Sequence, residues 1–175
     1  MTQTKHLGGA QLPLVECINS RIGRCAVRWG YEPADEGGIS YMEQVIDHRP
    51  TLHEVKDIVL AAMNADIDTQ IATGFMWAPA DSDMAPMPVW LSTENQFNYK
   101  AAFDLAIQTG GQNLPQTFKF GTTQQPVYYT FTTVADLQDF YTRAMAYING
   151  VLVDGWKRKD AVDWTRYEVL LNTVE

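Results

Sequence analysis

The chain has 175 residues, 46% of them hydrophobic, and a formal net charge of −8. This length suits one domain with a sizeable core, and the negative charge argues against a nucleic-acid surface, which needs basic residues to match phosphates. No apolar run approaches the roughly 18–20 residues that span a membrane, and residues 1–6 lack the apolar stretch of a secretory signal. We therefore expect a cytoplasmic protein with no membrane or nucleic-acid partner.

The first fifty residues are rich in strand patterns. Residues 14–18 and 25–31 are typical of strands, joined by the polar turn 19–23. Residues 39–46 form a third candidate strand after the turn cluster 32–38, which contains Pro33, Gly37 and Gly38. These segments predict an antiparallel β-meander.

The two cysteines, Cys17 and Cys25, are eight residues apart, with no further cysteine to complete a zinc site. If they lie on neighbouring strands, a disulfide is geometrically possible. A cytoplasmic protein usually keeps such residues as thiols, so we expect two small buried hydrophobic side chains.

A long helix is predicted to begin after Thr51. Thr51 and Glu54 have the spacing of a capping box, in which each side chain accepts a hydrogen bond from the other residue's amide. Gly74 is placed to end the helix in a left-handed conformation. Apolar residues follow one helical stripe between these ends: Leu52, Val55, Val59, Met63, Ile67 and Ile71.

Residues 74–104 combine two short aromatic strands, 75–77 and 89–91, with a helix that follows directly. Ser92 is placed to cap that helix, which we expect to run to about residue 108, with Phe97, Ala101 and Leu105 on its apolar face. The insert 78–88 holds three prolines and two aspartates. Because proline lacks an amide donor, we expect the insert to be exposed, mobile and outside any regular ladder.

The last third of the chain predicts a hairpin and two helices. Residues 118–121 and 127–131 are strand-like around a short loop. Thr133 opens a long helix that Gly150 and Gly155 weaken, so we expect it to bend or break before Trp156. The tail 160–171 is expected to be helical.

No candidate catalytic set is convincing. His48 and His53 are five apart, whereas a ligand pair on one helix face needs a spacing of four. Ser92 lacks a nucleophile elbow and fits better as a helix cap. Acidic residues of the last long helix (Asp136, Asp139 and Asp154) and the basic cluster Lys157-Arg158-Lys159 are typical of solvated surface. We predict a non-enzymatic protein with no metal and no cofactor.

Aromatic residues offer the main alternative to a purely architectural interpretation. Trp77, Trp90, Tyr128 and Tyr129 fall on predicted strands. Strand aromatics usually belong to a core. If these four are exposed, their ring faces could bind sugars or the apolar surface of a partner.

Several motifs, in this order, resemble a known family. They are Gly74-Phe75-x-Trp77 after a helix, Val89-Trp90-Leu91-Ser92 before one, Phe118-Lys119-Phe120-Gly121, the Thr133-capped helix, and Gly155-Trp156-Lys157-x-Lys159-Asp160-x-x-Asp163-Trp164. Together they resemble a domain of unknown function common in tailed bacteriophages and prophages, in the form found in phages of gut Bacteroidetes and often encoded near tail and tail-fibre genes. The resemblance covers residues 50–167 and departs at the insert 78–88, where a tight turn is expected. It implies a phage setting and no reaction.

We therefore predict an α+β protein, with an N-terminal antiparallel β-meander module at 1–49 and a helical domain with two β-hairpins at 50–175. The resemblance implies a non-enzymatic phage or prophage structural or assembly protein, associated with the tail or tail fibre. It would act in the host cytoplasm during assembly or in the virion. Its partners would be other tail or virion proteins, or further copies of itself, contacted through the module. The alternative is a carbohydrate-binding module that uses Trp77, Trp90, Tyr128 and Tyr129. A cell-wall hydrolase, which needs two converging carboxylates, ranks third.

Overall fold

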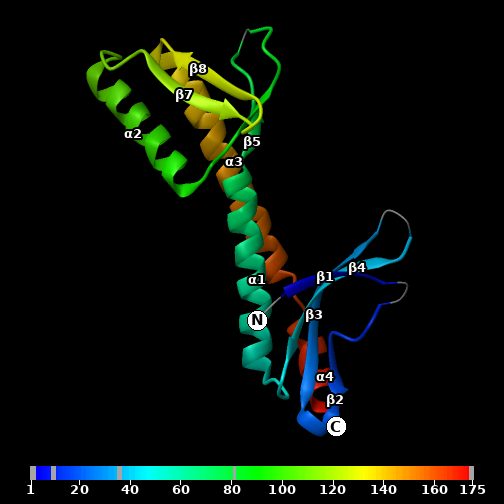
Figure 1. Cartoon of the computed structure of the whole chain (residues 1–175). Helices are drawn as coiled ribbons and strands as arrows, with labels where there is room; N and C mark the ends of the chain where they lie inside the picture. The colour runs from blue at the N-terminus through cyan, green and yellow to red at the C-terminus, as the bar shows by residue number, and fades with distance from the viewer. Residues whose placement is uncertain (1–2, 9–10, 35–36, 81, 174–175) are drawn as a thin grey trace. The chain divides into compact units, whose positions relative to one another are not determined.

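The computed structural model describes residues 3–8, 11–34, 37–80 and 82–173 (Figure 1). The chain divides into two compact units, the first made of residues 1–63 with 158–175 and the second of residues 64–157. The fold is α+β, as predicted: a four-stranded antiparallel sheet at the N-terminus, then helices with two β-hairpins between them.

The sheet of the first unit contains the predicted meander and one further strand. Strands β2 (Val15–Asn19), β3 (Arg24–Pro33) and β4 (Ile39–Ile46) follow the sequence prediction closely. Strand β1 (Gln3–Gly8) pairs antiparallel with β4 and gives the order β1-β4-β3-β2. The sequence did not indicate β1 because its side chains are exposed or half-buried, so no apolar alternation marks it.

One face of this sheet packs on two helices, α1 (Leu52–Thr73) and α4 (Trp164–Thr173). The buried residues come from all three elements: Val15, Cys25, Val27 and Ile46 of the sheet, Val55 and Val59 of α1, and Tyr167 and Leu171 of α4. The Tyr167 hydroxyl also donates to the Arg28 carbonyl at 2.8 Å. The described unit thus extends beyond residue 49, and the separability of residues 1–49 stays a prediction.

Arg28 joins three strands of the sheet. Its guanidinium, 4% exposed, contacts Glu43 of β4 at 2.6 Å and Glu16 of β2 at 2.7 Å, and it donates to the Pro13 carbonyl at 3.0 Å. A buried charge is tolerated only with such partners. Cys17 and Cys25 lie opposite each other across β2 and β3, and both are free thiols. Cys25 is buried as expected, whereas Cys17 is only half-buried, so the expectation of two buried side chains was wrong for Cys17. Part of the predicted turn cluster, residues 35–36, lies outside the described residues.

The predicted ends of α1 are confirmed. The Glu54 amide donates to Thr51 Oγ1 at 3.2 Å, and the Thr51 amide donates to Glu54 Oε2 at 2.8 Å, which completes the capping box. Gly74 ends the helix with φ of +77°. A Cβ at Gly74 would overlap the Val89 carbonyl oxygen, so this position excludes every side chain.

In the second unit, a short hairpin precedes the helix that Ser92 caps. Strand β5 (Phe75–Trp77) pairs with β6 (Met87–Val89), and α2 (Thr93–Thr109) follows. The prediction that all of 78–88 lies outside a ladder was wrong at Met87 and Pro88, since Met87 is buried and Pro88 pairs opposite Met76. A ladder this short can accept a proline because only some of its amides take part in the pairing.

The insert is exposed at residues 80 and 82–86, as expected, whereas Pro79 is buried. Residue 81, one of the two aspartates of the insert, lies outside the described residues, and the mobility of the insert stays a prediction. Only the central part of the insert is therefore known to be surface.

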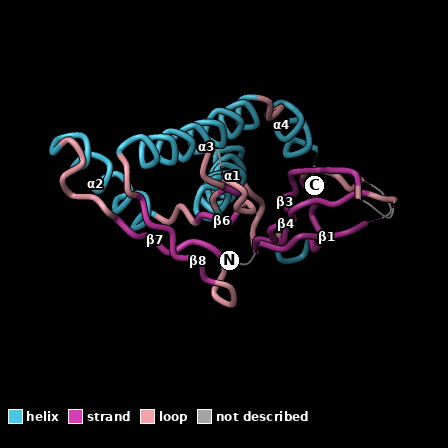
Figure 2. The backbone as a smooth tube through the Cα atoms, turned by 90° about the horizontal axis from the view of Figure 1, so that it is seen from above, coloured by secondary structure: helices cyan, strands magenta, loops and turns pink. Residues whose placement is uncertain are grey.

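The second hairpin, β7 (Gln116–Gly121) with β8 (Pro126–Phe131), packs on α3 (Val134–Asp160) (Figure 2). Helix α3 continues through both of its glycines, so the predicted break before Trp156 was wrong. Gly155 is buried because α1 packs closely there: a Cβ at Gly155 would overlap the Ile67 side chain. The helical tail is confirmed but begins only at Trp164, where Asp163 Oδ1 accepts the Thr165 amide at 3.1 Å.

We expect Gly74→Ala to prevent folding of the second unit or to destabilise it severely. The added methyl would overlap the Val89 carbonyl, and φ is positive at this position. Gly150→Ala is the matched control because no atom lies within 4 Å of its Cβ position in α3, and there alanine stabilises a helix by about 0.5–1 kcal/mol. Thermal unfolding followed by circular dichroism compares the two. An unchanged melting temperature in Gly74→Ala would contradict the close approach.

Candidate functional site: a groove between α2 and β7

An aromatic cluster fixes the walls of the site. Trp77 is only 2% exposed. Its ring lies 5.1 Å from Tyr129, 5.6 Å from both Phe120 and Phe131, and 5.2 Å from Phe140, measured between centroids. These contacts join β5, the hairpin β7–β8 and α3. The pairs with Tyr129, Phe120 and Phe140 are edge-to-face, an arrangement that adds about 0.5–1.5 kcal/mol per pair beyond area burial.

Tyr99 attaches α2 to this cluster. Its ring lies 5.0 Å from both Phe118 of β7 and Phe140 of α3, in edge-to-face arrangements. On the same side of α2, Ala106 is buried and Phe103 stacks on Tyr141 at 4.6 Å.

The predicted apolar face of α2 was therefore wrong. Phe97 is 71% exposed and Leu105 47% exposed, and Ala101 is exposed too. The helix carries two apolar stripes. The stripe with Tyr99 and Phe103 packs into the core because these large aromatic rings bury more apolar surface. The other stripe is left on the surface.

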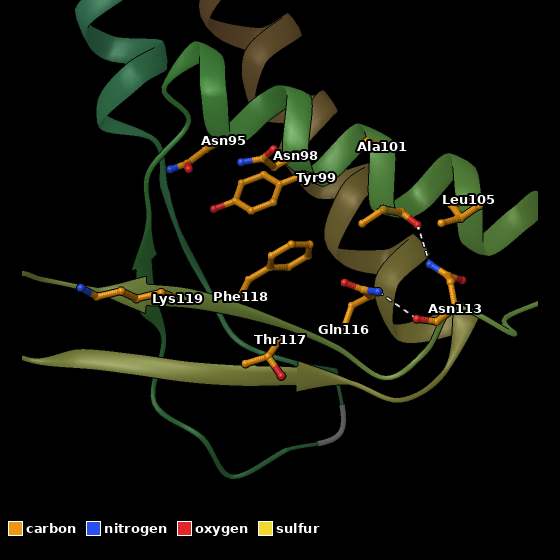
Figure 3. A pocket seen from close by; sticks show the side chains of 11 residues that line it. Asn95, Asn98, Tyr99, Ala101, Leu105, Asn113, Gln116, Thr117, Phe118 and Lys119 are labelled. Carbon is orange, nitrogen blue, oxygen red and sulfur yellow. Dashed lines mark hydrogen bonds between the residues drawn. The ribbon is translucent and has the colours of Figure 1, made fainter.

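Between α2 and β7 lies an open groove of about 490 Å³ (Figure 3). At one end, Asn113 Nδ2 donates to the Ala102 carbonyl at 3.3 Å and Gln116 Nε2 donates to the Asn113 carbonyl at 2.8 Å. Lys119 lies toward the other end (Figure 3). The lining comes from one helix face, the loop before β7, and β7 itself: Asn95, Asn98, Tyr99, Ala101, Ala102, Leu105, Asn113, Gln116, Thr117, Phe118 and Lys119.

The chemistry of the groove is hydrogen bonding and ring contact. Among the lining residues, Lys119 is the one charged side chain, and amides supply most of the polar atoms. Burial raises the pKa of Tyr99 to about 12, so its phenol is neutral at ordinary pH. A lining of neutral amides, hydroxyls and rings suits recognition of a ligand better than proton transfer.

The four aromatics proposed from sequence do not share one exposed surface. Trp77 is buried, and Tyr129 is half-buried with its ring 4.7 Å from Phe131. Trp90 is 48% exposed and donates its indole N–H to the Gly121 carbonyl at 2.9 Å. Tyr128 is 67% exposed. Only Trp90 and Tyr128 therefore offer ring surface to a ligand.

The other candidate residues have structural partners. His48 lies 3.0 Å from Glu54, and His53 lies 3.4 Å from Asp57. Ser92 Oγ accepts the Asn95 amide at 3.3 Å, as expected for a cap. On α3, Asp139 pairs with Arg143 and Asp154 with Lys157, while Asp136 lies in the first turn.

The described residues offer neither a metal site nor a membrane span. They contain no group of three or more His, Cys, Asp or Glu residues that could hold a metal ion. None of their helices is long and apolar enough to cross a membrane.

Sequence reasoning missed the amides of the groove. Asn95 and Asn98 are three residues apart and so share one face of α2, a signal that could have marked one wall. Asn113 and Gln116 come from a separate segment, and only tertiary packing brings them to the same groove.

Comparison of the chain with protein-family models, with curated proteins and with solved structures gives no match.

We expect Tyr99→Phe to reduce the loss of stability at alkaline pH. The folded pKa of Tyr99 is about 12, above the ordinary value of about 10. Between these values the unfolded chain releases a proton that the folded chain keeps, so stability falls as pH rises. At pH ~11 this contribution is about 1 kcal/mol.

Urea unfolding at about pH 9 and pH 11 measures the difference. Tyr128→Phe is the control, because it removes the phenol of an exposed ring by the same chemical change. An equal loss in wild type and Tyr99→Phe would show that the buried phenol does not contribute.

Proposed function

We propose that this chain is a non-enzymatic structural or assembly protein of a phage or prophage tail, which acts by binding other tail or virion proteins or further copies of itself. The resemblance of residues 50–167 supports the phage setting. Two residues of the motifs have architectural roles. Gly74 allows the backbone to approach the Val89 carbonyl closely, and Ser92 caps a helix. These roles agree with a family whose motifs carry no reaction.

The observation that carries the proposal is the open edge of the first unit. Strand β1 ends the sheet order and pairs with β4 alone among the described strands. A strand edge presents amide and carbonyl groups that can pair with a strand of another chain. Leu7 of β1 is 79% exposed, so apolar surface accompanies the open edge.

Mass spectrometry of purified virions tests the setting. A component is expected in amounts stoichiometric with tail proteins, and an assembly factor is expected in infected cells but not in virions. Co-purification of tail proteins with the tagged chain from infected cells supports either role. Recovery of the chain with no tail protein in either sample would contradict the proposal.

We expect Leu7→Glu to weaken self-association or partner binding about tenfold while the melting temperature stays unchanged. The side chain is on the surface, so a charge there costs little in the folded unit, but it would be desolvated in an edge-to-edge contact. Ile22→Glu on the short helix η1 (Ser20–Ile22), 51% exposed, is the control. Sedimentation and pull-down assays measure both variants. Equal binding by the two would exclude β1 as the contact.

A carbohydrate-binding role is the second candidate, and the exposed rings of Trp90 and Tyr128 favour it. Exposed aromatic faces contribute binding area at low entropic cost. We expect a glycan ligand to change tryptophan fluorescence, and Trp90→Phe to remove that change while the exposed Trp156 stays present. No response across a broad glycan panel would exclude this role.

A further inference from the structure

One edge of β7 faces away from β8, and three observations identify the residues on it. The Thr122 amide donates to the Gln125 carbonyl at 3.1 Å, so the next pair, Gly121 with Pro126, falls at a non-hydrogen-bonded position. The Gly121 carbonyl accordingly accepts the Trp90 indole from the side away from β8. Thr117 and Thr130 bring their hydroxyl oxygens to 2.9 Å, as the closer side chains of a non-hydrogen-bonded pair do.

Because the backbone of a strand repeats every two residues, the direction in which each N–H and C=O group of β7 points then follows. Those of residues 116, 118 and 120 turn toward β8, whereas those of Thr117 and Lys119 turn toward the other edge. Within the described chain, β8 is the one strand that pairs with β7. Both Thr117 and Lys119 line the groove. Up to Gly121, where Trp90 occupies this edge, one wall of the groove is therefore a strand edge without a paired strand, with donors and acceptors at a two-residue spacing.

The opposite wall offers apolar surface. Ala101 and Leu105 of α2 line the groove and are exposed. An extended chain that pairs with a strand edge turns alternate side chains to each side, so an apolar residue would meet this wall. A groove between a strand edge and a helix with these properties suits the addition of one peptide strand.

The charge of the groove limits further which kind of ligand can bind there. Lys119 is exposed and lies toward one end of the groove (Figure 3), and it is the single charged residue of the lining in a chain of net charge −8. We propose that the groove between α2 and β7 binds an extended segment of a partner protein, which adds as a strand to the edge of β7, places an apolar residue against Ala101 and Leu105, and carries an Asp or Glu opposite Lys119. This site belongs to the second unit and does not depend on the tail setting or on β1.

The test uses a surface-displayed library of short random peptides as the probe and the full chain as the target. We expect enriched sequences that share an apolar residue near an acidic one. Ala101→Arg fills the groove and is expected to weaken binding of the enriched peptides at least tenfold. Ile107→Arg adds the same side chain at an exposed position of α2 outside the lining, and is expected to bind as wild type does.

A charge exchange tests the role of Lys119. Lys119→Glu changes an exposed side chain, so the fold is retained, and we expect about tenfold weaker binding of acidic peptides together with selection of Lys- or Arg-containing ones. Hydrogen exchange of the wild-type complex is expected to slow at the amides of Thr117 and Lys119. The amides of Phe118 and Phe120, already in the ladder, are expected to change little.

Four results would overturn the proposal. The first is a library that yields no enriched peptide. The second is a set of peptides that bind Ala101→Arg as well as wild type, and the third is peptide binding that leaves hydrogen exchange at Thr117 and Lys119 unchanged. The fourth is a glycan that binds wild type but not Ala101→Arg, because it would assign the groove to carbohydrate instead.

Discussion

Burial of Trp77 among four aromatic rings is the interaction on which the second unit depends. The strand β5 that carries Trp77 begins directly after Gly74, where the backbone approaches Val89 so closely that no side chain fits. The ring then contacts the hairpin β7–β8 and α3 together. Its indole N–H meets no hydrogen-bond acceptor among the described residues, so the position of Trp77 is determined by the burial and ring contacts of its large side chain.

The groove is a consequence of this cluster. Because Tyr99 packs against Phe118 and Phe140, α2 lies beside the edge of β7 and turns its aromatic stripe inward. Ala101 and Leu105 are then left on the surface next to the amides of Thr117 and Lys119. The constraint that forms the core therefore also leaves an open strand edge and an apolar wall facing one space.

Local signals in the sequence predicted the elements that local chemistry determines. The capping box of Thr51 and Glu54, the caps at Ser92 and Thr133, and the turn at Gly74 all lie where they were expected. Tertiary contacts determine the features of the fold that local sequence signals did not predict. Strand β1 forms because it pairs with β4. Helix α3 continues through Gly155, where the absence of a side chain leaves room for Ile67.

The candidate site was predictable only in part, for the same reason. Aromatics on the predicted strands were singled out, but the predicted strand 89–91 was wrong at its end, since β6 stops at Val89. Trp90 therefore lies just after the strand and is 48% exposed, whereas Trp77 on β5 packs into the core. Asn113 and Gln116 carry no local signal of a site, because their place in the groove depends on the packing of α2 against β7.

A site-specific photocross-link in cells that produce the chain tests most directly the proposal that the groove between α2 and β7 binds a segment of a partner protein. A photoreactive diazirine analogue of leucine would replace Leu105, which lines the groove, and in a parallel sample Ile107, which is exposed on the same helix outside the lining. We expect a cross-link from position 105 to an extended segment of one partner protein, and none from position 107. No protein adduct at position 105, or the same adducts at both positions, would contradict it.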